Sequence, residues 1–289
     1  MSFDQLPKLP PMLHPGADEY AERALSESRM AAENMLFVGD LPYGEDPWQA
    51  LDIYVPPSVD KADRKLPVLF ILHGGAWMNG FKEWMGFMAP AIASAPAILV
   101  SASYRLAPAV GMDEIVDDCF RALSWVHENI TNYGGDTARI YVGGHSAGGH
   151  LAAILALRPE IMSAYATPSD LVKGCFLISA TLDLSFLNSP MTDAEIRLKE
   201  ALGAGAEAWS PKAFVQNART SFYLNWGQND FPRTVMQNKE FVRSLEQQGV
   251  PVSWDEIPGH DHFSVHLASG ASDSAWAKRV ITSLTTGNQ

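Results

Sequence analysis

Short apolar runs alternate with segments of helical periodicity along almost the whole chain, and this alternation restricts the fold more than any other feature. The runs are apolar on both faces, as in a parallel sheet that helices cover on both sides. We expect strands at 51–55, 67–75, 97–104, 139–144, 174–180, 221–227 and 250–258, and intervening helices at 112–130, 147–158, 235–249 and 272–286. A chain of 289 residues with this pattern predicts one domain, 1–289, built on a mostly parallel, doubly wound α/β sheet.

Two helical segments fall outside this rhythm. Residues 17–33 precede the first expected strand, and residues 184–216 lie between two strands but contain no strand pattern of their own. Helices that lie beside a cleft commonly shape a substrate pocket. We therefore expect both segments to form a small cap over the site, and peripheral helices without a role in the pocket are the alternative.

The composition excludes several classes of partner. Twenty-one Lys and Arg against 33 Asp and Glu leave a net charge of −12, which disfavours nucleic acid and anionic membranes. No apolar stretch reaches the ~18 residues of a membrane span, and the N-terminus has no signal-peptide pattern. Cys119 and Cys175 lie in apolar surroundings without metal-ligand spacing. We expect a cytoplasmic protein with buried free thiols.

The stretch GGHSAGGH, residues 143–150, joins an expected strand to an expected helix. Its G-x-S-x-G pattern in this setting is typical of a sharp turn that presents a nucleophilic serine at the carboxyl edge of a sheet. The glycines leave room where neighbouring backbones approach closely. A Gly-rich turn is the alternative, and a phosphate-binding loop is disfavoured because no Gly-Lys-Ser/Thr follows. We interpret Ser146 as the nucleophile.

A serine hydroxyl needs a base, and the base needs an orienting group. In this architecture the acid is expected before the base, each in a loop after a strand. Asp230 follows the strand at 221–227, and His262 follows the last strand. Asp183 and His260 are the alternatives for the acid and the base, and His266 is interpreted as a structural surface histidine. The order predicts a triad of Ser146, Asp230 and His262.

The segment ILHGGAWMNG, residues 71–80, ends an earlier strand with unshielded backbone N–H groups. Such groups can bind the oxyanion that develops when a carbonyl is attacked. Gly75, Ala76 and Ala147 are the expected donors, while His73 is expected to hold the loop by hydrogen bonds. A plain turn is the alternative interpretation.

Large apolar side chains follow this loop and open the 184–216 segment. Some of them are expected in the core and others in a pocket for the acyl or leaving group. The pocket candidates are Trp77, Met78, Trp84, Phe186 and Leu187. No metal site is expected, because the histidines near the motif have no ligand spacing with a carboxylate.

Several segments together carry a family resemblance: LDIYVP, HGGAW, SYRLAP, NYGGDTARI, GHSAGGHLAA, the Asp230 loop and HDHF, from about residue 43 to 266. With them the chain resembles the α/β-hydrolase superfamily, within the esterase and arylformamidase group related to hormone-sensitive lipase. HGGAW and GHSAGG stand where many lipase-like members have HGGG and GDSAGG. This departure is similar to the kynurenine formamidase-like members.

The triad and the resemblance imply a serine hydrolase that cleaves a small carboxylic ester with a short acyl group, and an aromatic leaving group is one option. No cofactor is expected. The alternative enzyme is an arylformamidase acting on an N-formyl aromatic amine such as N-formylkynurenine. A non-catalytic ligand-binding member of the fold is the alternative from another class, although such proteins typically lose a triad residue. The expected partner is a small ester or amide substrate, and the sequence leaves a homodimer open.

Overall fold

The computed structural model describes residues 3–10, 14–57, 65–189 and 191–287. Within these residues the centre is an eight-stranded sheet with the order β1-β2-β4-β3-β5-β6-β7-β8. The strands are β1 (Leu36–Pro42), β2 (Ala50–Val55), β3 (Leu66–Leu72), β4 (Ile98–Ala102), β5 (Gly135–His145), β6 (Val172–Ile178), β7 (Ser221–Gly227) and β8 (Val252–Ile257). Strand β2 is antiparallel to both of its neighbours, and the remaining pairs are parallel. The predicted mostly parallel, doubly wound sheet is confirmed.

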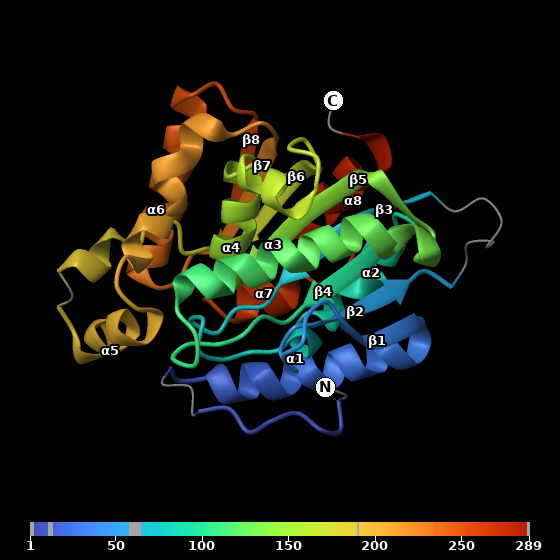
Figure 1. Ribbon diagram of the computed structural model, residues 1–289, viewed down its shortest axis with the longest axis horizontal. Helices are drawn as coiled ribbons and strands as arrows, with labels where there is room; N and C mark the ends of the chain where they lie inside the picture. Colours follow the sequence, from blue (N-terminus) through green and yellow to red (C-terminus); the bar gives the residue numbers. More distant parts are fainter. Residues whose placement is uncertain (1–2, 11–13, 58–64, 190, 288–289) are drawn as a thin grey trace.

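Helices cover both faces of this sheet (Figure 1). They are α1 (Ala17–Asn34), α2 (Ala89–Ala93), α3 (Met112–Asn129), α4 (Ala147–Leu157), α5 (Asp193–Leu202), α6 (Pro232–Gln247), α7 (Ser264–Ala268) and α8 (Ala275–Thr286). Val68, Phe70 and Leu72 of β3 pack with α3, α4 and α6 in one core layer. Leu69 and Ile71 pack with α1, α2 and α8 in the other. Alternate side chains of one strand therefore enter two separate cores, as the continuous apolar runs predicted.

The edge strand β1 was not predicted. Its side chains are half-buried or exposed, so it has none of the continuous apolar character of the central strands. It pairs with β2 through an irregular register between Val38 and Leu41. An edge strand with one partner and a solvated face leaves a weak hydrophobic pattern.

The described part of the segment predicted as an insertion contains short helices and no strand. It contains the 3₁₀ helices η6 (Ser185–Asn188), η7 (Ala206–Trp209) and η8 (Pro211–Asn217) as well as α5, which lies at the periphery of the molecule (Figure 1). Residues 17–33 fall within α1, which packs beside η2 (Lys82–Trp84) and η3 (Gly86–Met88). The cap role of both segments stays a prediction.

Among the described helices, none has the length and apolar character required to cross a membrane. Cys119 and Cys175 are both buried and unpaired, as their apolar surroundings predicted.

Candidate active site

Ser146 lies on the abrupt turn from β5 into α4. Its backbone has φ 55° and ψ −118°, a conformation that costs free energy for any residue with a side chain. A Cβ atom on Gly144 would lie 2.3 Å from the Gly148 carbonyl carbon, and one on Gly148 would lie 2.1 Å from the Leu72 oxygen. The two motif glycines are therefore required by the close approach of β3, β5 and α4 around the serine.

The three residues predicted as a triad lie in hydrogen-bond contact. His262 Nε2 is 2.9 Å from Ser146 Oγ, and His262 Nδ1 is 2.8 Å from Asp230 Oδ1. The Asp230 side chain is fully buried and that of His262 is 8% exposed. A carboxylate at Nδ1 favours the tautomer whose Nε2 lone pair can accept the serine proton.

Asp230 also receives two further hydrogen bonds. The N–H of Phe231 donates to Oδ1 over 2.7 Å, and the hydroxyl of Ser179 donates to Oδ2 over 2.5 Å. Ser179 comes directly after β6 and was not singled out from the sequence. The sequence placed Ser179 inside the expected strand at 174–180, so no signal marked it as a residue of the loop at the site.

The alternative acid and base have other contacts. Asp183 Oδ1 accepts the N–H of Ser185 over 2.8 Å, and Asp183 Oδ2 lies 3.5 Å from Lys212 Nζ. It thus caps the turn that begins η6. The His260 carbonyl accepts the N–H of Asn229 over 2.8 Å. Within the described chain, neither side chain hydrogen-bonds to Ser146 or His262.

The loop after β3 lies against the serine turn, because a Cβ on Gly74 would be 3.1 Å from Ser146 Cβ. Gly75, Ala76 and Trp77 all have positive φ angles of 115°, 53° and 59°. The N–H groups of Met78 and Asn79 close the turn on the Gly75 carbonyl, at 3.1 and 2.9 Å. In the described residues, the N–H groups of Gly75, Ala76 and Ala147 have no hydrogen-bond acceptor in the protein. They are therefore free to bind a ligand.

His73 holds this loop in the way the sequence predicted. Its Nδ1 donates to the Gly74 carbonyl over 2.8 Å, and its own carbonyl accepts the Tyr104 hydroxyl over 2.8 Å. The two rings stack at 4.3 Å. Burial lowers the pKa of His73 to about 4, so the imidazole is neutral at pH 7.

The prediction that His266 lies on the surface is wrong. This residue is fully buried, stacks on His145 at 4.3 Å, and lies 2.8 Å from the Tyr20 hydroxyl through Nδ1. Tyr20 belongs to α1 and is almost 250 positions away from His266 in the sequence. His145 in turn donates from Nε2 to the His262 carbonyl over 2.9 Å. Burial lowers the pKa of His145 well below its usual value and that of His266 to about 3.

The five pocket candidates separate into two groups. Trp77, Trp84 and Leu187 are 2%, 4% and 0% exposed and pack in the hydrophobic core, so their place in a pocket stays a prediction. Trp77 meets the His150 ring edge-on, and Trp84 meets Tyr20 of α1 in the same way. Met78 and Phe186 are only partly buried, and the Arg233 guanidinium lies 4.2 Å above the Phe186 ring. These two remain candidates.

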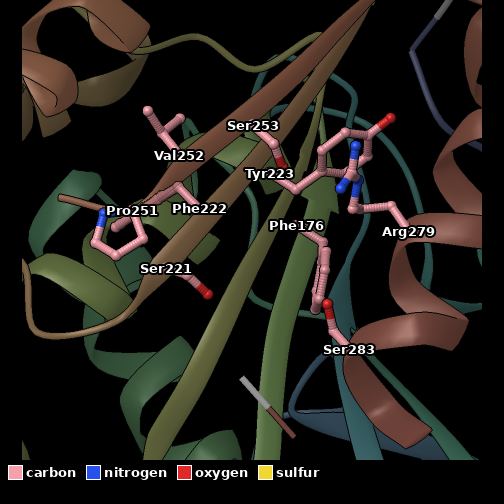
Figure 2. A pocket seen from close by; sticks show the side chains of 9 residues that line it. All are labelled: Phe176, Ser221, Phe222, Tyr223, Pro251, Val252, Ser253, Arg279 and Ser283. Carbon is pink, nitrogen blue, oxygen red and sulfur yellow. The ribbon is translucent and has the colours of Figure 1, made fainter. Parts of the chain in front are cut away.

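In the described ranges, no group of three or more His, Cys, Asp or Glu side chains could hold a metal ion. A hollow of about 150 Å³ lies at the other end of the sheet, around the first residues of β7 and β8. Figure 2 shows Arg279 and Ser283 of α8 facing Tyr223 and Phe176 across it. It contains none of the residues predicted as catalytic.

Known proteins are similar to this chain over most of its length. A family model described as alpha/beta hydrolase fold matches residues 69–266. Kynurenine formamidase of Danio rerio is 31% identical over 231 residues, 78% of this chain and 74% of that protein. The Mycobacterium tuberculosis protein named "Probable carboxylic ester hydrolase LipM" is 30% identical over 239 residues, 78% of this chain and 55% of that protein.

The fold has a close counterpart among solved structures. Esterase B from Lactobacillus rhamnosis superposes with a TM-score of 0.73 at 20% identity, over 93% of each chain. The family model, the relatives and the sheet order agree with the fold that the sequence motifs implied. The chain therefore belongs to the α/β-hydrolase fold family.

Proposed function

We propose that the protein is a serine hydrolase that cleaves a small carboxylic ester through an acyl-enzyme. The observation that carries this proposal is the continuous hydrogen-bond chain from Ser146 Oγ through His262 to Asp230. Linked in this way, with Asp230 and His262 buried, the three groups can activate a hydroxyl that is nearly inert by itself.

In the proposed reaction, Ser146 Oγ bonds to the ester carbonyl carbon while His262 Nε2 takes the hydroxyl proton. The N–H groups of Gly75, Ala76 and Ala147 bind the negative oxygen of the tetrahedral intermediate. The ester C–O bond then breaks, and His262 returns the proton to the leaving oxygen. Water repeats the same steps on the acyl-enzyme and releases the acid. Side chains and backbone supply every group in this sequence, so we expect no cofactor.

The two helical segments are proposed to shape the substrate pocket. On one side, the ring of His14, just before α1, lies 4.6 Å from that of Phe231, which lies 4.6 Å from the His262 ring. On the other, Arg233 at the start of α6 forms an ion pair with Glu195 of α5. The residues just before α1 and helix α5 therefore contact Phe231 and Arg233, which follow Asp230 in the chain.

A second candidate is hydrolysis of an N-formyl aromatic amine. It is supported by the similarity to kynurenine formamidase of Danio rerio, which matches over 74% of its length. The same triad can attack a formyl amide, with an amine as the leaving group.

Two measurements test these proposals. A fluorophosphonate probe should label the wild-type protein at Ser146 and should leave Ser146→Ala unlabelled. The ratio of kcat/KM for p-nitrophenyl acetate and formanilide then separates the two substrate classes. We expect the ester to be the better substrate, whereas a far higher value for the formyl amide would establish the second candidate. An unlabelled wild-type protein would overturn both.

A further inference from the structure

Ser179 is a fully buried serine beside the triad. The roles of Ser146, His262 and Asp230 do not explain why a serine lies at this position. Ser179 follows β6, the strand between β5, which leads to Ser146, and β7, which leads to Asp230. The N–H of Ser146 donates to the carbonyl of Ile178 over 2.9 Å, and the N–H of Ser179 donates to the backbone carbonyl of Asn225 over 2.8 Å. The backbone of Ser179 is thus tied to the strands on both sides.

The backbone conformation at Ser179 favours glycine. Its φ angle is 48°, and the residue is fully buried. Glycine adopts this conformation without the steric cost that a serine Cβ brings. A serine at this position is thus explained by its hydroxyl, and the hydrogen-bond partner of that hydroxyl is Asp230 Oδ2 at 2.5 Å.

The Ser179 hydroxyl donates to Oδ2 of Asp230, the carboxylate oxygen that does not contact His262. Oδ1 of Asp230 accepts from His262 Nδ1 and from the Phe231 N–H, at 2.8 and 2.7 Å. A carboxyl group can rotate about its terminal torsion, which is broad and roughly two-fold. A carboxylate that accepts hydrogen bonds at both oxygens can no longer rotate in this way. Hydrogen bonds to a charged carboxylate are also stronger than those between neutral groups.

We propose that Ser179 is a fourth member of the catalytic arrangement, a positioning residue that fixes the Asp230 carboxylate so that Oδ1 faces His262. This inference rests on the proposed serine hydrolase function. Ser179 acts only through Asp230 and takes no proton from the substrate.

The test compares kcat and KM of wild type, Ser179→Ala and Ser179→Gly on p-nitrophenyl acetate. Both variants lose the hydroxyl, but glycine also relieves the backbone strain. We expect kcat to fall about tenfold in both, the size expected for one charge-assisted hydrogen bond, with KM unchanged. The melting temperature of Ser179→Gly should be no lower than that of Ser179→Ala.

A double-mutant cycle shows whether the effect passes through the acid. In an Asp230→Asn background, Ser179→Ala should change kcat less than twofold, because the carboxylate that it positions is absent. Ser101→Ala is the matched control, since Ser101 is a fully buried serine on β4 whose hydroxyl donates to the Lys82 carbonyl over 2.6 Å. It should keep the wild-type kcat.

Wild-type kcat in both Ser179 variants would overturn the inference, and so would an equal loss of kcat with and without Asp230. Loss of the folded state in both variants would do the same, because Ser179 would then be a structural residue. Failure of the proposed function is distinguishable, since in that case the fluorophosphonate probe does not label the wild-type protein at Ser146.

Discussion

Polar side chains of similar types lie at the two ends of the sheet, around strands β5 to β8, but they make different contacts. At the carboxyl end, the side chains of Ser146, His262, Asp230 and Ser179 form one hydrogen-bonded chain. At the amino end, the hollow in Figure 2 is lined by three serines and Arg279. Within the described residues, no hydrogen bond joins the serine hydroxyls Ser221, Ser253 and Ser283 to one another.

Burial explains the contrast between the two ends. As whole residues, Asp230 and His262 are each only 6% exposed, so their polar atoms need hydrogen-bond partners inside the protein. The serines of the hollow are partly exposed, and Arg279 is exposed and lies 5.5 Å from the Tyr223 ring. Water satisfies such groups as well as a neighbour does. Similar residue types therefore form a connected site only where the strand ends and their loops exclude solvent.

The largest expected effect comes from the charge at the carboxyl end. Asp230→Asn keeps the shape of the side chain but replaces the carboxylate that accepts from His262 Nδ1. The amide can hold the wrong tautomer, so kcat on an aryl ester should fall by about 10³- to 10⁴-fold. Steady-state kinetics measure this loss, and Asp183→Asn is the control because Asp183 caps a turn. A decrease below tenfold would mean that Asp230 is not the orienting acid.

The next effect tests the oxyanion loop. Gly75→Ala places a Cβ 2.2 Å from the Asn79 oxygen at φ 115°, so the loop must shift and displace its N–H donors. We expect kcat to fall by about 10²-fold, comparable to the loss of one donor. Gly249→Ala is the matched control, since Gly249 also has a positive φ, of 70°, but no neighbour within 4 Å of the added atom. Similar kcat values in the two variants would contradict a donor role.

A smaller effect is expected on stability at acid pH. Burial lowers the pKa of His150 to about 4, against about 6.5 when unfolded, and its Nε2 donates to the Trp209 carbonyl. Between these values only the unfolded chain binds the proton, so the folded state loses stability as the pH falls. At pH 5.5 this amounts to about 1 kcal/mol relative to pH 7.5.

Urea unfolding at pH 5.5 and pH 7.5 gives the free energy of unfolding of wild type and of His150→Gln. The contribution of His150 is the difference between the two proteins in how far this free energy changes with pH. Gln keeps a donor for Trp209 but does not titrate. Contributions from other groups cancel in this difference, including that of Glu83, whose pKa burial raises to about 7. Equal pH dependence in the two proteins would show that His150 is protonated as readily in the folded state as in the unfolded chain.

The smallest effect is expected at the amino end. Arg279→Ala and Ser253→Ala alter the hollow in Figure 2 but touch no residue of the triad. Both variants should keep kcat and KM within about twofold, and substitutions at such exposed sites typically change stability by less than about 0.5 kcal/mol. A tenfold change in either constant would show that the two ends are coupled, and the contrast between them would fail.

Much of the carboxyl end could be predicted from the sequence because its constraints are local. A strand that enters a helix through Gly144, Ser146 and Gly148 needs small neighbours within a few residues. The apolar runs are continuous and have the length of a strand that is buried on both faces in a parallel sheet. The edge strand β1 lacks this signal, because one of its faces meets solvent.

The sequence by itself determined the alternating fold and the chain order of Ser146, Asp230 and His262, because strand periodicity and turn chemistry are properties of neighbouring residues. Tertiary structure alone decided that Ser179 holds Asp230 and that α1 buries His266. It also decided that Trp84 packs against Tyr20 of α1. These contacts join residues about 50 to 250 positions apart, and only the packing of layers determines which distant side chains meet.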